Sequence, residues 1–383
     1  MFNTNTNHPL IQRQQTYNLN KKILTIHSED RDVTKWPFSN HFSIECPEIY
    51  QNVETIRVVD TCFPSSQFIF NNDYQNTKMV FTIYPETDTS EWHTALGLNV
   101  NGSYIVEISE GNYTPEQLAI ELENKMNKAV NDYLSTAPGS PYSPYLNFKV
   151  YYDPVNYSLY FGNLNDSFTL KCGTEIAYIL RQCEQPNVFK QNTHWGLPWH
   201  LGFGKTDYIS NKLVDTDGSQ PVIMYHLPYG SPNYVWMAVG TSTEPTFYLK
   251  APLSLKLVGD NVIYMEIEKY NYLDELVPYV TNTSSSSNKV NNYGGIMNSA
   301  FVKIPIIESH YSYSFDSIST LLNNCGYFLP PIEKIPRLKF KFRYHDGRLV
   351  DFKDLPFNFS LEINQIRNDM DRNYSIKTPT FHN

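Results

Sequence analysis

The chain has 383 residues, 18% of them charged and 15% aromatic, and its formal net charge at pH 7 is −9. This balance argues against a general nucleic-acid binder, which normally carries a basic excess. No apolar run reaches the roughly 20 residues that a transmembrane helix needs. The start of the chain lacks the pattern of a secretory signal, and the five cysteines are scattered and odd in number. We therefore expect reduced thiols and synthesis in a cytosolic setting.

The N-terminal part predicts a polar arm over residues 1–20, followed by strands. Lys22–His27 and His41–Cys46 read as strands, and the charged, proline-containing turn SEDRDVTKWPFSN separates them. Val53–Asp60 continues the sheet with alternating side chains, and Phe63-Pro64-Ser65-Ser66 ends it. An antiparallel sheet is therefore expected directly after the arm.

One helix is indicated by its start signals. Thr114 can cap it, Pro115 suits the first helical position, and Gln117 completes a capping box. Its apolar stripe recurs at helical spacing through Leu118, Leu122, Met126, Ala129 and Tyr133. We expect this helix to pack against the sheet or to close one end of it. A shorter helix is predicted over Thr174–Gln182.

The central part predicts turns and hairpins. Phe148–Phe161 contains an Asp-Pro-Val-Asn turn between two strand patterns, and the Gly and Pro residues of Trp195–Gly204 indicate a corner. Leu253–Val258 and Val262–Lys269 predict a second hairpin around a Gly-Asp-Asn turn.

The strongest pattern lies in Arg337–Ile363, which predicts an antiparallel meander. Alternation places Lys339, Lys341 and Arg343 on one side of a strand, and on the other side Leu338, Phe340, Phe342 and Tyr344. Asp346-Gly347 then supplies a turn, and Arg348–Phe352 and Phe357–Ile363 read as return strands. Together these patterns predict an all-β antiparallel sandwich over residues 21–363, with a subdivision near 205–220 left open, and a polar tail over 364–383.

The search for metal sites returns weak candidates. His194 and His200 bracket Trp195 and Trp199, a pattern that favours a structural aromatic corner over a metal site. The run Glu29-Asp30-Arg31-Asp32 offers oxygen ligands to a hard cation, but its arginine favours ion pairs that fix the turn.

The search for catalytic groups also returns little. Asp274 and Glu275 follow each other on a strand, so they point to opposite faces and are expected to be solvated rather than to form a glycosidase pair. Cys172 and Cys183 have no evident histidine partner. We therefore predict no catalytic, cofactor-binding or metal-binding residue, and no cofactor.

The basic stripe of Lys339, Lys341 and Arg343 leaves two interpretations open. It is either a solvated outer face, which keeps the sheet soluble and protects it from association, or a positive patch that docks on an acidic neighbour. In the second case these three residues are inter-subunit contacts.

Several segments, taken in order, resemble the minor capsid proteins of nucleocytoplasmic large DNA viruses. They span roughly residues 23–363 and are Ile26–Asp32, Tyr50–Val59 with the break at Pro64-Ser65, Gly111–Leu118, Leu201–Phe203, Tyr270–Tyr272, Phe342–Tyr344 with Asp346-Gly347, and Phe359–Ile363. The chain departs from the family at His27, where an acidic residue often stands. Glu184–Trp199 and the Ser-rich segment Thr281–Asn292 have no counterpart in it.

The resemblance implies a jelly-roll antiparallel β-sandwich with one or two inserted helices and extended terminal arms. It implies a non-enzymatic structural protein of the virion, made in the host cytoplasm, that ties together or supports capsomers. The implied partners are major capsid protein capsomers and other minor capsid proteins. No direct contact with nucleic acid is implied, and the internal membrane surface is reached only through partners.

Three alternatives remain. The first is a penton protein at the five-fold vertices of the same kind of shell. The second is a carbohydrate-binding β-sandwich, supported by Trp92, Trp195, Trp199 and Trp236, because such rings can stack on sugars. The third is an enzyme on a jelly-roll scaffold, such as a glycoside hydrolase, which would need two facing carboxylates about 5–10 Å apart.

Overall fold

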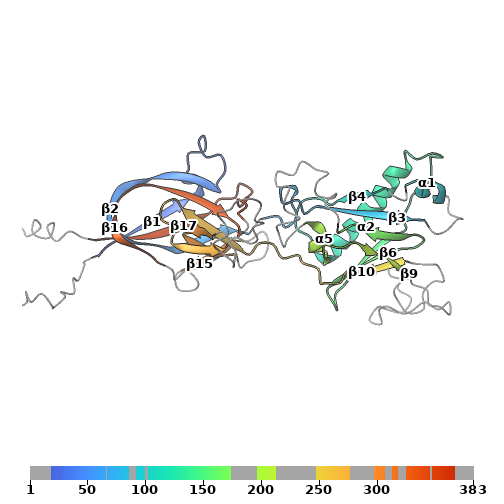
Figure 1. Cartoon of the computed structure of the whole chain (residues 1–383). Coiled ribbons are helices and arrows are strands. Elements are labelled where there is room, and N and C mark those ends of the chain that lie inside the picture. The colour runs from blue at the N-terminus through green and yellow to red at the C-terminus, as the bar shows by residue number, and fades with distance from the viewer. Residues whose placement is uncertain are drawn as a thin grey trace, which may run out of the picture. The chain divides into compact units, whose positions relative to one another are not determined.

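The computed structural model of the chain describes residues 19–65, 67–85, 92–99, 102–173, 196–212, 247–276, 297–306, 313–317, 325–345 and 347–366. The chain divides into two compact units, both visible in Figure 1. Unit 1 comprises Met1–Gln67, Asp260–Pro278 and Ser286–Asn383, and unit 2 comprises Phe68–Gly259 and Tyr279–Ser285. The arms predicted over 1–20 and 364–383 lie almost wholly outside the described residues. So does part of the subdivision predicted near 205–220.

Strands dominate both units, and every strand pairing in the described residues is antiparallel. The predicted all-β antiparallel fold class with an inserted helix is therefore confirmed. The shorter helix predicted over Thr174–Gln182 lies outside the described residues.

The main sheet of unit 1 has the strand order β1-β17-β2-β16-β11-β14, with β15 also paired to β2. The bounds are β1 Leu19–His27, β2 His41–Pro64, β11 Val262–Ile267, β14 Val302–Pro305, β15 Tyr313–Ser317, β16 Gly326–Arg343 and β17 Asn358–Ile366. A separate ribbon pairs β12 (Leu273–Leu276) with β13 (Met297–Ala300), and a 3-10 turn spans Ser28–Asp30. Strands from both ends of the chain thus alternate around the long β2.

The meander predicted over the C-terminal part is wrong in its connectivity. β16 pairs with β2 and β11, whereas β17 pairs with β1 and with the other side of β2. The segment predicted as the return strand, 348–352, makes only an isolated bridge between Leu349 and Arg343, formed by the bonds from Tyr344 N to Arg348 O and from Val350 N to Phe342 O. Lys353 and Asp354 both adopt positive φ, which turns the chain away before β17 begins.

The interior of unit 1 consists largely of phenylalanine rings. The four side chains predicted to face inward, Leu338, Phe340, Phe342 and Tyr344, are only 1, 0, 0 and 1% exposed, so that prediction is confirmed. On β2, the ring of Phe63 lies 5.4 Å from that of Phe342 and 4.8 Å from that of Phe357. Each such ring contact adds about 0.5–1.5 kcal/mol beyond the burial itself. This shared core favours β2 as the neighbour of both β16 and β17.

Unit 2 holds two four-stranded sheets and the helices. One sheet has the order β5-β6-β10-β9 and the other β4-β3-β7-β8. The strands are β3 Lys78–Tyr84, β4 Tyr104–Glu107, β5 Phe148–Asp153, β6 Ser158–Asn163, β7 Ser167–Leu170, β8 Tyr208–Ile209, β9 Asn211–Lys212 and β10 Phe247–Lys250. The helices are α1 His93–Gly97, α2 Pro115–Leu134 and α5 Leu197–His200, with a 3-10 turn at Asn72–Tyr74. The predicted β5–β6 hairpin is confirmed, and α5 lies within the predicted corner.

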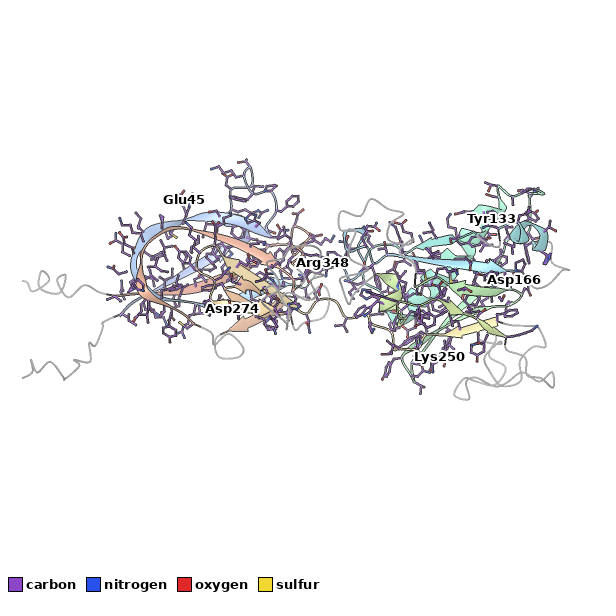
Figure 2. The ribbon with its side chains drawn as sticks, viewed as in Figure 1. Glu45, Tyr133, Asp166, Lys250, Asp274 and Arg348 are labelled. Atoms are coloured by element: carbon purple, nitrogen blue, oxygen red, sulfur yellow. The ribbon has the colours of Figure 1, made fainter. Side chains whose placement is uncertain are left out.

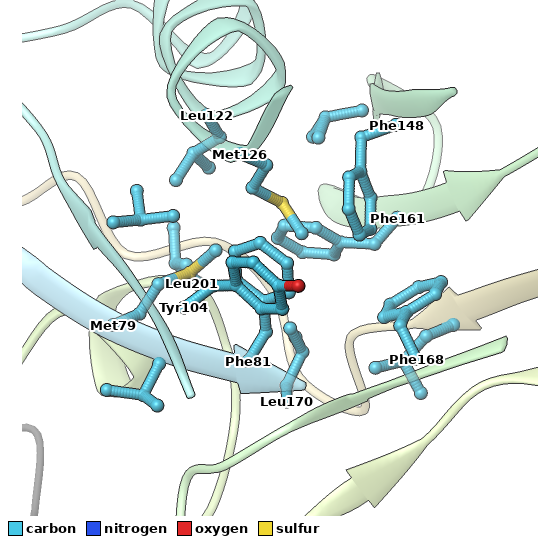
Figure 3. Close-up of a cluster of buried hydrophobic side chains, with 14 of the residues drawn as sticks. Met79, Phe81, Tyr104, Leu122, Met126, Phe148, Phe161, Phe168, Leu170 and Leu201 are labelled. Carbon is cyan, nitrogen blue, oxygen red and sulfur yellow. The ribbon is translucent and has the colours of Figure 1, made fainter. Parts of the chain in front are cut away.

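Helix α2 begins as its start signals predict. Gln117 N donates to Thr114 Oγ1, and Thr114 N donates to Gln117 Oε1. Its buried face packs against β4 and β5 over a core that includes Met126 and Phe148 (Figure 3). This face also carries Asn127, which the sequence stripe omitted. Asn127 is 5% exposed, and its side chain donates to Phe148 O and accepts from Phe148 N, both at 3.0 Å.

The hairpin predicted around residues 259–261 is wrong in its first strand. Leu253–Val258 forms no strand, because its amides donate elsewhere within unit 2: Leu253 N to Gly202 O, Leu255 N to Tyr157 O and Lys256 N to His200 O. The chain then passes from unit 2 to unit 1 between Gly259 and Asp260. The second strand, β11, pairs with β14 and β16 instead.

Candidate interaction surface

The basic stripe lies on β16, between β2 and β11. Lys341 is opposite Glu266 of β11 in the strand register, and the backbone N of Glu268 donates to Lys339 O. The acidic side chains of Glu266 and Glu268 therefore stand beside the cations of β16. Cross-strand pairs of opposite charge stabilise a sheet modestly.

Lys339 and Lys341 are neutralised by these neighbours. Lys339 Nζ lies 2.9 Å from Glu268 Oε2, and Lys341 Nζ lies 3.5 Å from Glu266 Oε2. The hydrogen bond and charge of Lys339 lower the pKa of Glu268. The two lysine side chains remain 38% and 41% exposed, so both can still contact a partner.

Arg343 is not on the surface, so neither interpretation of the stripe describes it. Its side chain is 1% exposed, its Nε pairs with Glu266, and its Nη1 lies 2.8 Å from Glu275 Oε2. Glu275 itself is 5% exposed and also pairs with His345 Nδ1. The prediction that Glu275 is solvated is therefore wrong, whereas Asp274 beside it, labelled in Figure 2, is exposed. Glu275 reaches Arg343 from β12, which no local pattern around Arg343 could indicate.

A second buried carboxylate, Glu362 on β17, joins three strands. It pairs with Lys21 of β1, and Arg57 Nη2 of β2 lies 2.9 Å from its Oε2. Burial raises the pKa of Glu362, but hydrogen bonds from Arg57, Lys21 and Asn364 outweigh burial and lower it to about 2. The carboxylate thus stays ionised at neutral pH and links β1, β17 and β2 through its two ion pairs.

A groove of about 980 Å³ opens beside the stripe. Its wall includes the exposed face of β16, the turn after β11, the loop between β1 and β2, and parts of both those strands. Its lining is Leu24, Thr25, Asp30, Asp32, Lys35, Trp36, Ser43, Ile44, Glu45, Pro47, Glu268, Lys269, Tyr270, Lys334, Pro336, Arg337 and Lys339. Lys339 therefore belongs both to the basic stripe and to the groove, whereas Lys341 belongs to the stripe but does not line the groove.

The charged turn after β1 is fixed by hydrogen bonds rather than mainly by ion pairs. Arg31 donates to the carbonyl oxygens of Ser28, Trp36 and Pro37. Asp30 accepts a bond from His27 N, and Asp32 accepts from Thr34. Both carboxylates thus serve the turn. Among the described residues, no three His, Cys, Asp or Glu side chains gather closely enough to form a metal centre.

The other candidates for chemistry have structural surroundings. His200 is 7% exposed, and its Nδ1 lies 2.9 Å from Lys256 O. Burial raises the pKa of the Cys46 thiol to about 11 and also raises those of Cys62, Cys172 and Cys325. High pKa values disfavour the reactive thiolate. Cys183, His194 and Trp195 lie outside the described residues. In the part of the chain that the structure describes, no helix is long and apolar enough to cross a membrane.

Two solved structures align with most of the chain at low identity. The mavirus penton protein is 8% identical with a TM-score of 0.41, and the alignment covers 91% of this chain and 100% of that one. A chain of the Sputnik virophage is 10% identical with a TM-score of 0.39, and the alignment covers 92% of this chain and 99% of that one. A comparison with curated proteins found no match. Residues 11–305, more than half of the sequence, match a family described as a family of unknown function (DUF5901), and the chain belongs to that family.

Proposed function

We propose that this chain is a non-enzymatic structural protein of a large icosahedral DNA virus, specifically a minor capsid protein that ties together or supports major-capsid capsomers. The observation that carries the proposal is the ordered set of segments that resemble minor capsid proteins of nucleocytoplasmic large DNA viruses. The proposed partners are capsomers and other minor capsid proteins, and the proposed location is the virion.

The positions of these segments support the proposal. Ile26 is the penultimate residue of β1, Tyr50–Val59 lies within β2, Phe342–Tyr344 spans the end of β16, and Phe359–Ile363 lies within β17. These four strands are consecutive neighbours in one sheet, although more than 300 residues separate the first from the last. These four segments therefore belong to one sheet of unit 1, as expected if they specify a common scaffold, whereas Gly111–Leu118 and Leu201–Phe203 lie in unit 2.

The contact surface that we propose on this unit includes Lys339 and Lys341. Their partial exposure leaves the ammonium groups accessible, and the glutamates beside them limit the net attraction. Such a surface sets the orientation of a neighbour more than its affinity. Arg343 is left out of this surface because it is buried.

Quantitative mass spectrometry of purified virions tests the function. We expect the chain to be present at a copy number below that of the major capsid protein. Its absence from virions, or its presence only in infected-cell lysate, would refute the capsid role. A capsid reconstruction at side-chain resolution then distinguishes two positions: density beneath or between capsomers assigns a minor capsid protein, and density at the five-fold vertices assigns a penton.

The carbohydrate-binding alternative depends on exposed aromatic rings. Trp92 Nε1 donates to Ser143 O, and its ring lies 5.4 Å from that of Tyr145. The ring of Trp199 has the Lys256 ammonium at 4.2 Å from its centroid. Both rings thus already contact unit 2 itself. Trp195 and Trp236 lie outside the described residues. A glycan array that shows specific binding would revive this alternative.

A further inference from the structure

Two strands of unit 1 present an edge that pairs with no described strand. β17 pairs with β2 only from Val53 onward, so the stretch 41–52 of β2 has β16 on one side and no described strand on the other. Among the strands that the structure describes, β1 pairs with β17 alone. An open edge carries unpaired backbone donors and acceptors, which natural proteins usually cover or pair.

Both edges border the groove, and their backbone groups point into it. Ser28 N donates to Phe357 O, so the even-numbered residues of β1 form its backbone hydrogen bonds to β17. The backbone N–H and C=O of Thr25, an odd-numbered residue, therefore face the open edge of β1. Phe342 N donates to Asn40 O, so the even-numbered residues at the start of β2 form the backbone hydrogen bonds to β16. The backbone N–H and C=O groups of Ser43 and Glu45 therefore face the open edge of β2. All three open-side residues line the groove.

The two strands are held as opposite walls. The connection of residues 28–40 joins the end of β1 to the start of β2. At one end of the walls, Lys22 Nζ lies 3.2 Å from Glu48 Oε1. At the other end, the Trp36 ring packs edge-on against His41, 4.9 Å between centroids. The edges therefore stay on either side of the groove without bonding to each other in the described structure.

The charges of the groove favour an acidic occupant. Its five cations are Lys35, Lys269, Lys334, Arg337 and Lys339, and its four acids are Asp30, Asp32, Glu45 and Glu268. Three of the acids are already engaged, Asp30 with His27 N, Asp32 with Thr34 and Lys35, and Glu268 with Lys339, and Lys334 pairs with Glu333 outside the groove. Among the described residues, Lys269 and Arg337 are exposed and form no ion pair.

The groove also offers apolar contacts. Trp36, Tyr270 and Pro336 line it between the charged side chains. Lys269 is held beside Tyr270 with φ +75°, a backbone conformation that a non-glycine residue rarely adopts and that is often found at functional positions. An occupant with alternating acidic and apolar side chains therefore finds partners for both sets.

We propose that this groove binds an extended acidic segment of another polypeptide, which inserts as a strand between the open edges of β1 and β2. Main-chain hydrogen bonds to the two edges supply affinity, and the cations beside them select acidic side chains. The inference goes beyond the capsid role, because it names the kind of partner and concerns binding that purified protein can show without particles.

A synthetic peptide of alternating glutamate and valine, carrying a fluorophore, tests the proposal by anisotropy with the full chain. We expect saturable binding that Lys269→Glu/Arg337→Glu weakens about tenfold or more. Lys303→Glu is the matched control, because Lys303 is exposed on β14 and is not part of the groove, and it should leave binding unchanged. A peptide N-methylated at alternate residues should also bind about tenfold or more weakly, because it loses the donors of one edge.

Several results would overturn the proposal. They are an absence of binding, equal affinity for a lysine–valine peptide, unchanged affinity after N-methylation, and unchanged affinity of the double variant. Binding that emerges only when residues 1–18 are deleted would assign the groove to the chain's own N-terminal segment and would equally overturn it.

Discussion

Replacing Arg343 with methionine is expected to destabilise unit 1 while leaving its surface almost unchanged. The Arg343 side chain is 1% exposed and pairs with Glu266 and Glu275. Methionine fills much of the same space without the charge. Glu266 keeps Lys341 at 3.5 Å, but Glu275, which is 5% exposed, loses the guanidinium and retains only its contact with Nδ1 of the half-exposed His345.

The size of the effect follows from the buried carboxylate. Removing one partner of a buried ion pair costs about 3–5 kcal/mol, because the remaining charge is desolvated and uncompensated. The lower end applies here, about 3 kcal/mol, since one of the two glutamates keeps a lysine. In a unit of this size each kcal/mol lowers Tm by roughly 2–4 °C, so Tm should fall by about 6–12 °C.

Urea denaturation followed by circular dichroism at pH 7 measures this loss. Arg337→Met on the same strand is the control, because Arg337 is exposed and forms no ion pair among the described residues, and its change should stay within about 0.5 kcal/mol. The double variant Arg343→Met/Glu275→Leu should recover part of the stability, because it also removes the buried carboxylate of Glu275 that has lost its guanidinium partner. If Arg343→Met stays within about 1 kcal/mol of the native chain, the buried network does not stabilise unit 1 as argued.

Three further predictions concern other residues. Asn127→Ala should lower the free energy of unfolding by about 2–3 kcal/mol in urea titrations, because it leaves the buried backbone N–H and C=O of Phe148 in β5 without their side-chain partner. A loss below about 0.5 kcal/mol would contradict this. Lys339→Glu/Lys341→Glu should impair particle assembly but leave the purified chain folded, as measured by circular dichroism. A normal particle yield would instead indicate that the two lysines form a solvated face and make no inter-subunit contact. The pKa of Glu362 is lowered from 4.5 to about 2, so its contribution is present above pH 4.5 and is lost as pH falls through 2. At about 1.4 kcal/mol per pH unit this contribution is about 3 kcal/mol, and Glu362→Gln should flatten acid titrations of stability accordingly.

Local patterns predicted the faces of strands better than their neighbours. The alternation from Leu338 to Tyr344 identified the buried side of β16, because side-chain direction in a strand depends only on residue parity. The same alternation contains no information on which strand lies alongside. The insertion of β2 between β16 and β17 depends on Phe63, which lies far away in sequence and packs against rings from both segments.

The functional residues show the same division. The helix start at Thr114 and Pro115 is local, so its capping box could be predicted. Arg343 was placed with the lysines because parity put it on their side, but β12 covers that end of the strand and supplies Glu275. The groove could not be predicted at all, because an open strand edge is defined by the partners that a strand lacks.

Lys339 and Lys341 distinguish the two surfaces proposed on β16. Both face the same side of the strand, and each has a glutamate partner of its own. Only Lys339 lines the groove between β1 and β2, with its ammonium 5.9 Å from the centroid of the Trp36 ring. A strand that inserts into the groove therefore contacts Lys339 but not Lys341, whereas a neighbour that docks on the flat face contacts both. Assembly lost in Lys339→Glu but retained in Lys341→Glu would thus assign the inter-subunit contact to the groove, and equal losses in the two variants would assign it to the face.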